Sequence, residues 1–306
     1  MRAVNQQRSS GRALERNDLL ESYDPERTGN YFILAESNAE IVHLIESDRY
    51  FNLAMGGPLP EQPEHVLAGI HDVLDVACGP GCWGFQLAQE YPHMQVTGID
   101  ISQNVIDYAN GQVQASRLDN VQFIVGNVMQ PLEFPDESFD LVNVRNMEAV
   151  IPVSAWPGTL KEMFRVTRRG GIIRIVDCEW GVSTGKASEQ MMELSVRGMQ
   201  IFGLSHSPDW HNYGVTPWLH RFLRDLGCVN VQERPSFLDF SVDSMAHQGC
   251  YIMFTHGYEM MKPFLIQAGV TTPEAFAQLQ QEQSVELLEN DFRGLLYILT
   301  AWGQKP

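Results

Sequence analysis

The segment Val73-Leu-Asp-Val-Ala-Cys-Gly-Pro-Gly-Cys-Trp-Gly84 decides the fold. Its apolar start leads into a loop that carries Gly79, Gly81 and Gly84, and a helical pattern follows at once. Glycines are required where the backbone turns sharply and approaches a ligand without a Cβ in the way. The following helix would present N–H groups and a partial positive charge to an anionic group. Alone the loop is a weak signal, because Ala77 occupies the position of the usual first glycine.

Short β-rich runs alternate with helical stretches on both sides of this loop. The predicted strands are Val73–Val76, Gln95–Ile99, Val121–Val125, Phe139–Val144 and Gly171–Val176, and the helices between them are Trp83–Glu90, Gln103–Ser116 and Ala155–Val166. Alternation at this pitch predicts βαβ units, and therefore an α/β fold with a parallel sheet covered by helices on both faces.

The flanking regions are predicted to be mostly helical. An N-terminal helix is capped by Ser37-Asn38 and ends at Gly56-Gly57-Pro58. The elements predicted after the fifth strand are a helix over Ala187–Phe202, a loop over His206–Trp218, a helix over Pro217–Leu226, a strand over Val229–Phe240, two amphipathic helices over Val242–Ala268 and Pro273–Glu289, and a last strand over Gly294–Trp302. Thr272 is the expected N-cap of the second amphipathic helix.

Composition and charge exclude several partners. The formal net charge is -17, with a pI near 4.8, and a field of this sign repels phosphate backbones and anionic lipid surfaces. Met1 to Arg16 lacks the apolar core of a signal peptide, and no stretch is long and apolar enough to cross a bilayer. The five cysteines are odd in number and form no CxxC pair, which fits a reducing compartment. We expect a cytoplasmic protein that binds neither nucleic acid nor membrane.

An acidic residue after the second strand gives the glycine loop its context. Asp100 lies about twenty residues beyond the loop, where a carboxylate can bind both hydroxyls of a ribose. Dinucleotide enzymes share this spacing. Asp75, however, would repel a pyrophosphate but can help to hold an ammonium group. After the third strand, Asn127 can accept a hydrogen bond from an adenine amino group, beside apolar contacts from Val128 and Met129. These features favour S-adenosylmethionine as the cofactor.

A family resemblance follows from these motifs. The run Val73–Gly81, with Asp100, Asn127, Phe139-Asp-Leu-Val142 and Arg168-Arg-Gly-Gly171, resembles the class I methyltransferases, and is most similar to the group that includes ubiquinone and menaquinone biosynthesis methyltransferases. The specific motifs cover about Val73 to Asp177. The resemblance implies a Rossmann-like doubly wound sheet with a final antiparallel strand. We expect an N-terminal helical cover (1–62), a cofactor-binding core (63–241), a helical insertion (242–291) and a last core strand (292–306).

The resemblance also implies roles for individual residues. Gly79 and Gly81 would line the methionine end of the cofactor, Asp100 would bind the ribose, and Asn127 with Val128 would frame the adenine. The residues expected to bind the cofactor are Asp75, Ala77, Gly79, Gly81, Asp100, Ile101, Asn127, Val128, Met129 and Arg145. Ala77 departs from the family glycine and Asn127 from a frequent aspartate, but alanine is small and the amide keeps an acceptor oxygen.

The acceptor side of the site is less sharply defined. Ligands of open parallel sheets bind outside the carboxyl ends of the strands, so the loop Arg145–Val150 should lie beside the transferred methyl group. The strand Val229–Phe240 would end on the same side. The inserted helices over Val242–Glu289 should then begin and end near the active site, as a lid, a dimer contact or both.

Methyl transfer is an in-line displacement, so the enzyme mainly aligns two partners. A hydroxyl acceptor needs a base, an amine needs its lone pair, and a carbon acceptor must be electron-rich. Candidate bases are His211, His206, His220 and Glu148, with Tyr31 as an orienting group. Each histidine can equally be solvated or structural. We expect no metal, because His206 and His211 alone are too few ligands.

Several functions stay open. The first is methyl transfer to an O, N or C atom of a small, largely apolar or aromatic metabolite, such as a quinone-like or secondary-metabolite scaffold. The second is another reaction, for example cyclisation or decarboxylation, supported by the same cofactor. The third is a non-catalytic cofactor-binding module. A nicotinamide oxidoreductase is disfavoured by Asp75 and Ala77. A homodimer is compatible with all of them.

Overall fold

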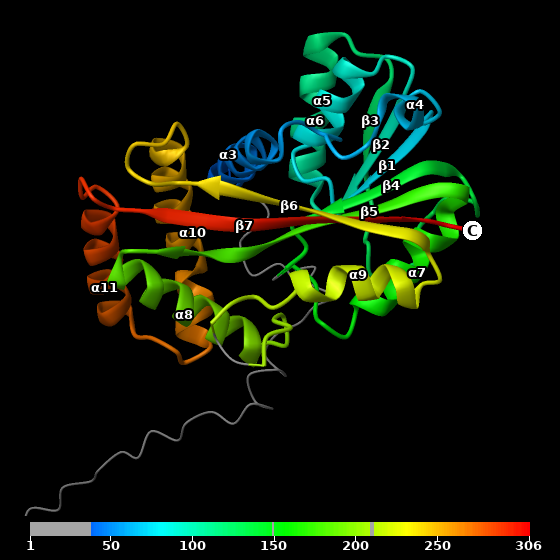
Figure 1. The fold of residues 1–306 in the computed structure, drawn as a ribbon. Helices are drawn as coiled ribbons and strands as arrows, with labels where there is room; N and C mark the ends of the chain where they lie inside the picture. The colour runs from blue at the N-terminus through cyan, green and yellow to red at the C-terminus, as the bar shows by residue number, and fades with distance from the viewer. Residues whose placement is uncertain (1–37, 149, 209–210) are drawn as a thin grey trace, which may run out of the picture.

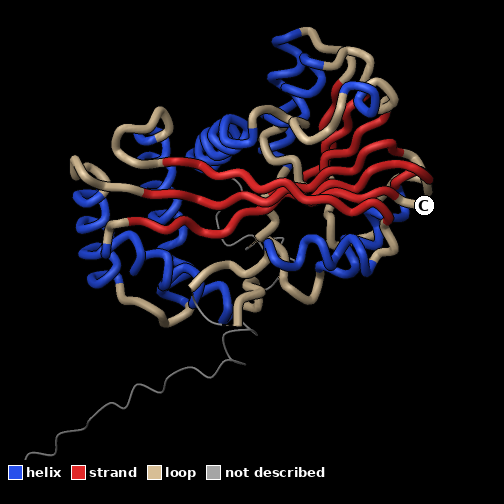
Figure 2. Tube along the Cα trace, in the orientation of Figure 1, coloured by secondary structure: helices blue, strands red, loops and turns tan. Residues whose placement is uncertain are grey.

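A seven-stranded sheet runs through the molecule (Figures 1 and 2). The computed structural model describes residues 38–148, 150–208 and 211–306. The strand order is β3-β2-β1-β4-β5-β7-β6. The strands are β1 (Asp72–Val76), β2 (Gln95–Asp100), β3 (Val121–Val125), β4 (Phe139–Arg145), β5 (Thr167–Ser183), β6 (Val229–Asp239) and β7 (Gly294–Gln304). β7 runs antiparallel to β5 and β6, and the pairs among β1 to β5 are parallel. The predicted parallel sheet with a final antiparallel strand is confirmed.

Helices cover both faces of the sheet. In chain order they are α3 (Asn38–Met55), α4 (Glu64–Leu67), α5 (Cys82–Glu90), α6 (Gln103–Ser116), α7 (Trp156–Val166), α8 (Lys186–Ile201), α9 (Thr216–Asp225), α10 (His247–Gln267) and α11 (Pro273–Glu286). Trp83 of α5 and Ile106 of α6 pack on one face of the sheet. Leu160 of α7 and Leu219 of α9 pack on the other, against Ile175. The doubly wound arrangement follows from these two apolar layers.

Local sequence sets the helix starts. The Ser102 hydroxyl accepts a hydrogen bond from the Val105 N–H at 3.3 Å, and Thr272 accepts one from the Ala275 N–H at 3.2 Å. The second contact confirms Thr272 as an N-cap. The predicted cap at Ser37 lies outside the described residues.

The fifth strand is much longer than the sequence indicates. We expected it to end at Val176, but it continues to Ser183 and pairs with β7 along its whole extension, with an irregular register between Glu179 and Val182. Asp177 and Glu179 therefore lie inside the strand. Acidic residues and Gly181 have low strand propensity, and pairing with β7 overrides it.

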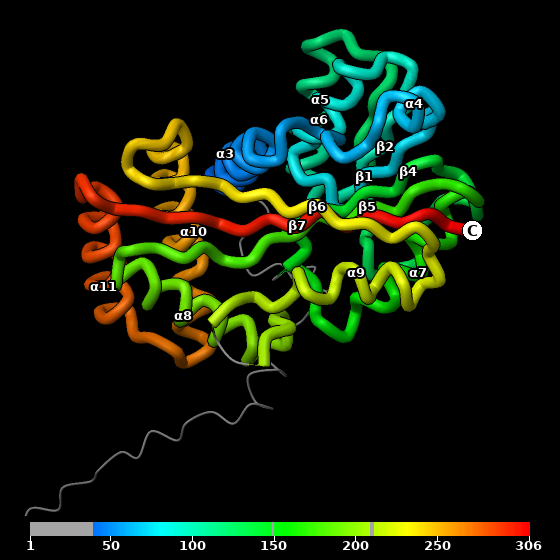
Figure 3. Tube along the Cα trace, in the orientation of Figure 1, coloured from blue at the N-terminus to red at the C-terminus, as the bar shows by residue number. Residues whose placement is uncertain are grey.

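The extension of β5 creates a sheet arm that carries a second apolar core. We define the sheet arm as Asp177–Ser183 of β5 with the paired parts of β7 and β6. β4 has its last pair at Val176, so the arm reaches about 23 Å beyond the β4 edge at about 3.3 Å per residue. α8, α10 and α11 share one apolar core with the arm, and α10 contacts α3; we call these three helices the helical lobe (Figure 3).

We expected the inserted helices to begin and end near the active site, because β6 was predicted to end on that side. The structure places both ends of the insertion elsewhere. Asp239, the last residue of β6, pairs with Leu295, and Gly294 pairs with Ser183 at the tip of the arm. The inserted helices therefore leave and rejoin the sheet at the far end of the arm. The physical reason is that β5, β6 and β7 stay paired along the whole arm, so β6 ends at the tip of the arm.

α8 lies within residues 63–241, the region predicted to be the cofactor-binding core. In the structure it packs with the inserted helices.

The sheet changes winding direction between β1 and β4. β1 continues through α5 to β2 on one side, whereas β4 and β5 follow on the other. The carboxyl ends of β1 and β4 therefore diverge into a crevice, which is the usual ligand position in such sheets.

Candidate functional site

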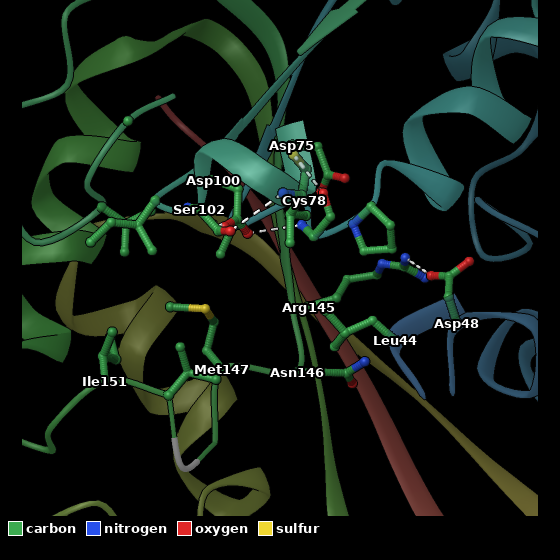
Figure 4. A pocket seen from close by; sticks show the side chains of 18 of the residues that line it. Leu44, Asp48, Asp75, Cys78, Asp100, Ser102, Arg145, Asn146, Met147 and Ile151 are labelled. Carbon is green, nitrogen blue, oxygen red and sulfur yellow. Dashed lines mark hydrogen bonds and ion pairs between the residues drawn. The ribbon is translucent and has the colours of Figure 1, made fainter. Parts of the chain in front are cut away.

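A hollow of about 1050 Å³, its open mouth included, occupies this crevice. Nine of the ten residues predicted to bind the cofactor line it, and Gly81 is the exception. Figure 4 shows the side chains of Asp75, Asp100 and Arg145 around it. The full lining is Glu40, Leu44, Ser47, Asp48, Asp75, Ala77, Cys78, Gly79, Pro80, Cys82, Asp100, Ile101, Ser102, Val105, Gly126, Asn127, Val128, Met129, Arg145, Asn146, Met147, Val150 and Ile151.

The loop after β1 is bent by left-handed backbone. Ala77 has φ +54°, Gly79 +55° and Gly81 +78°. A Cβ on Gly81 would lie 2.5 Å from the Phe123 ring, so packing against β3 explains this glycine. We expected Gly81 to line the hollow, but the tight turn points its backbone into the core. Ala77 adopts a conformation that costs an L-residue about 1–2 kcal/mol.

Asp100 holds the loop through its carboxylate. Its two oxygens accept hydrogen bonds from the N–H groups of Gly79 and Ser102, both at 3.0 Å. Burial raises the pKa of this carboxyl, and the two N–H donors oppose that shift. A carboxylate has about four lone-pair sites, so Asp100, which lines the hollow, keeps acceptor capacity for a ligand.

Asp75 is the innermost charge of the hollow. It is 2% exposed, and its Oδ1 accepts a hydrogen bond from Asn143 at 2.7 Å. Asn143 in turn accepts one from Arg174 at 2.8 Å, and Arg174 pairs with buried Glu61 at 2.7 Å. Burial raises the pKa of Asp75 to about 6, against the lowering effect of Arg145. This polar chain fixes the carboxylate without neutralising it.

Arg145 joins the floor of the hollow to α3. Its guanidinium forms an ion pair with Asp48 (Figure 4). It also donates a hydrogen bond to the Asn52 amide oxygen at 2.9 Å. Asn52 also bonds Asp48 and Gln86 of α5, at 2.9 and 3.0 Å. The guanidinium lies 5.6 Å from the centre of the Trp83 ring. α3 is thereby fastened over the hollow, and we name the Asp48–Arg145–Asn52 contacts the α3 clasp.

The charges around the hollow are unequal. Among the described lining residues, four are acidic (Glu40, Asp48, Asp75 and Asp100) and one, Arg145, is basic. The surplus favours a cationic ligand and disfavours a pyrophosphate. It also matches a sulfonium next to an ammonium group.

The wall opposite α3 is mostly apolar. Val128, Met129, Met147, Val150 and Ile151 come from the loops after β3 and β4. The Asn127 amide oxygen accepts a hydrogen bond from the Met129 N–H at 2.9 Å, which leaves its second lone pair for a ligand.

Asn146 has φ +54°, and its amide oxygen is buried without a hydrogen-bond partner in the described part of the chain. A buried unpaired acceptor costs about 1–3 kcal/mol. Such polar positions in strained backbone occur preferentially at ligand sites.

The histidines predicted as bases do not reach the hollow. His206 packs on the Trp156 and Phe222 rings, with centroids 5.8 and 5.7 Å away, and burial lowers its pKa to about 4. These contacts indicate that the His206 ring has a structural role in packing. His211 is exposed and is absent from the lining, and His220 faces Glu233 at 3.6 Å on the surface. Tyr31 lies outside the described residues.

Glu148 lies behind the β4 loop, not in the hollow. The Cys178 thiol donates to its Oε1 at 3.3 Å. Asp177 lies beside it. Burial raises the pKa of both carboxyl groups, and the charge of Glu148 raises the pKa of Asp177 further. Asp177 also accepts the N–H groups of Met147 and Glu148, both at 3.2 Å, so it anchors the loop that lines the hollow.

Glu148, Asp177 and Cys178 have donor atoms within 4.8 Å of one another, a spacing that a metal ion could use. Both Asp177 oxygens already accept backbone N–H groups, including that of Cys178 at 3.0 Å. This donor set is therefore engaged in holding the β4 loop.

The sequence predicted an N-terminal helical cover, but not the residues of α3 that line the hollow. Glu40, Leu44, Ser47 and Asp48 recur at helical spacing and line the hollow as one face. No local pattern in the sequence indicates which element this face covers. Cys78 and Cys82, which were not predicted as site residues, lie within the glycine loop, and Ser102 lies two residues after Asp100.

Comparisons with known proteins agree with this geometry. Residues 71–216 match a family model described as a methyltransferase domain. The demethylmenaquinone methyltransferase of Listeria monocytogenes (serotype 4b, strain CLIP80459) is 32% identical over 186 residues, which cover 58% of this chain and 73% of that protein. The demethylmenaquinone methyltransferase of Geobacillus kaustophilus is 42% identical over 181 residues, covering 53% and 72%. The YcgJ protein of Bacillus subtilis is 19% identical, with a TM-score of 0.48, over 80% of this chain and 100% of that one.

An enzyme class follows from the doubly wound sheet, the acid after β2 and these relatives. The chain belongs to the class I S-adenosylmethionine-dependent methyltransferases, and its relatives place it among those that act on small molecules. The expected cofactor and enzyme class are thus confirmed. Within the described residues, no helix is both long and apolar enough to cross a lipid bilayer.

Proposed function

We propose that this enzyme methylates an O, N or C atom of a small, largely apolar or aromatic metabolite. The observation that carries the proposal is the hollow itself, which is acidic toward β1 and α3 and apolar toward the β4 loop. S-adenosylmethionine supplies an electrophilic methyl group on a sulfonium. An acidic end suits that cation, and an apolar wall suits a neutral acceptor.

We assign the cofactor residues from the positions of their polar atoms. Asp100 is proposed to bind the ribose hydroxyls with the acceptor capacity that its contacts to the loop leave free. Asp75 is proposed to accept the ammonium group of the methionine end. Asn127, Val128 and Met129 are proposed to frame the adenine. The α3 clasp excludes water from this end, which strengthens each charge interaction.

The acceptor is proposed to lie between α3 and the β4 loop. Leu44, Met147, Val150 and Ile151 give this part an apolar surface, and the Asn146 amide is available for one polar group of the acceptor. No histidine of the described residues lines the hollow. The described residues around the hollow are therefore proposed to align the acceptor, and acceptors already nucleophilic at neutral pH suit this site.

The relatives narrow the acceptor class. Two of these relatives are demethylmenaquinone methyltransferases, and a quinol ring is electron-rich and apolar. We therefore place naphthoquinol-like compounds first among acceptors to be screened. All five cysteines are free thiols, which supports a location in a reducing cytoplasm. A homodimer stays a prediction.

The first test is calorimetric titration with S-adenosylmethionine, S-adenosylhomocysteine and NAD. We expect the first two to bind and NAD not to bind. Asp100→Asn should weaken binding by about 10- to 100-fold, because charge-assisted hydrogen bonds contribute about 1.5–3 kcal/mol.

Asp140→Asn is the matched control. Asp140 also accepts two backbone N–H groups, of His71 and Asp72 at 2.9 Å, but it does not line the hollow. Its substitution should lower stability and leave affinity unchanged. Binding of NAD alone, or equal losses in both variants, would contradict the proposed site. Mass analysis of products then separates methyl transfer from cyclisation or decarboxylation.

A further inference from the structure

Two faces of α3 contact different parts of the molecule. Glu40, Leu44, Ser47 and Asp48 line the hollow, whereas Tyr50, Phe51 and Met55 belong to the apolar core of the helical lobe. Figure 1 shows α3 between the helices that cover β1 to β3 and α10 of the lobe. One rigid helix therefore contacts the cofactor hollow and the lobe at the same time. If α10 pushes on α3, the side of α3 that lines the hollow must shift as well, because close-packed interiors transmit strain.

Two glycines of α10 set how closely the helices approach. A Cβ on Gly249 would overlap the Tyr50 ring, and a Cβ on Gly257 would lie 3.0 Å from Cε1 of His43. Gly249 and Gly257 are eight residues apart, so they share one face of α10 and form a flat seam for α3. Burial lowers the pKa of His43 to about 4, so the seam is uncharged at neutral pH.

One stretch of α3 contacts two partners. Tyr50 contacts Gly249, and two residues away on either side Asp48 and Asn52 make the α3 clasp with Arg145. An ion pair and a hydrogen bond share the one Arg145 guanidinium, so the clasp depends on the position of α3. The absence of a side chain at Gly249 leaves the space that the hydroxyl end of the Tyr50 ring occupies.

We propose that the helical lobe sets the affinity of the cofactor site through α3, with Tyr50 and Gly249 as positioning residues. The proposal rests on the assignment of the hollow to the cofactor. It gives the insertion a role that is neither a lid nor a dimer contact. In this proposal the insertion acts as a brace: contacts between α10 and α3 hold α3 in the position in which Asp48 and Asn52 can bind Arg145.

The decisive variant is Gly249→Ala, measured by calorimetry with S-adenosylmethionine and S-adenosylhomocysteine. The added methyl group pushes Tyr50 away, so we expect affinity to fall by about tenfold, the loss of roughly one charge-assisted contact. The double variant Gly249→Ala, Tyr50→Leu removes the overlapping ring and should recover most of the loss. If Gly249→Ala does not fold, Gly257→Ala gives the same test with a milder overlap.

Gly198→Ala is the matched control. Gly198 of α8 also faces α10, where a Cβ would lie 2.8 Å from Leu265 and 3.0 Å from Phe264, but it does not contact α3. We expect a lower Tm and an affinity within about twofold of the parent. Equal affinity losses in Gly198→Ala and Gly249→Ala, or no loss in Gly249→Ala, would overturn the proposal.

Hydrogen exchange gives a readout without cofactor. In Gly249→Ala the amides of α3 should exchange faster than in the parent, and in Gly198→Ala they should not. Unchanged exchange of α3 in Gly249→Ala would also overturn the brace. Failure of the parent protein to bind S-adenosylmethionine would instead contradict the proposed function, while the exchange comparison would still decide the proposal about α3.

Discussion

The two ends of the sheet differ in what they bury. Around β1 and β4 the interior includes a polar chain, Asp75–Asn143–Arg174–Glu61, directly beneath an open hollow. Around the sheet arm the interior consists mostly of aliphatic, aromatic and methionine side chains from α3, α8, α10 and α11. Buried ionised groups lower stability unless they are paired, whereas apolar cores raise it. β5 runs through both regions, so the strand that carries Arg174 of the polar chain also forms part of the apolar core of the lobe.

The strongest test of this comparison is a cavity in the lobe. Phe276 of α11 is fully buried, and Phe276→Ala should lower the free energy of unfolding by about 3–5 kcal/mol. Because β5, β6 and β7 are shared, the variant should still unfold in one transition in denaturant, followed by fluorescence and circular dichroism. Two separate transitions would show that the regions are independent. Val285→Ala, exposed on the same helix, is the control.

A substitution in the polar chain Asp75–Asn143–Arg174–Glu61 should change the free energy of unfolding by less than Phe276→Ala does, and in the opposite direction. Asp75→Asn keeps the shape and one acceptor oxygen but removes a buried charge, so stability at pH 7 should rise by about 1–3 kcal/mol. Affinity for S-adenosylmethionine should fall by about tenfold or more as the proposed ammonium partner is lost. Thermal unfolding and calorimetry measure the two changes.

The pH dependence of stability tests whether the charge of Asp75 destabilises the folded protein. The pKa of Asp75 is raised from 3.8 to about 6 in the folded protein, so the folded state binds its proton more tightly than the unfolded state. The contribution of Asp75 to stability is therefore present below pH 3.8 and is lost as pH rises to about 6. Cofactor affinity of the parent should rise over the same upper range. A stability gain of Asp75→Asn that is equal at pH 4 and pH 7 would contradict this explanation.

The smallest effect is expected in the loop after β1. Ala77→Gly relieves left-handed strain of about 1–2 kcal/mol, but glycine adds about 0.5–1 kcal/mol of unfolded-state entropy. The net gain in the free energy of unfolding should be about 0.5–1 kcal/mol, measured by denaturant titration. A loss of stability would mean that the loop is not strained at Ala77.

The cofactor half was largely predictable because its signals are local. Gly79, Asp100 and Asn127 lie at strand ends, and a parallel sheet brings such ends to one edge whatever the rest of the chain does. Gly81 misled us because a glycine required for packing against Phe123 looks the same in sequence as one required by a ligand.

The rest depended on contacts between distant residues. Nothing near Glu179–Ser183 predicts a strand, because its partner is Gly294–Tyr297, more than a hundred residues later. His206 and His211 were chosen for their chemistry, but only tertiary packing determines which side chains reach the hollow. The clasp between Asp48 and Arg145 joins residues with no common motif.

The continuity of β5, β6 and β7 has a kinetic consequence. These three strands join the sheet to the lobe, so their pairing opposes a swing of the lobe away from the hollow. The hollow already has an open mouth, and a short opening of α3, in which Asp48 and Asn52 release Arg145, would widen it. The spent cofactor would then leave faster when the clasp breaks more often. Stopped-flow release of S-adenosylhomocysteine from Asp48→Asn should be faster than from the parent, even where the chemical step is unchanged.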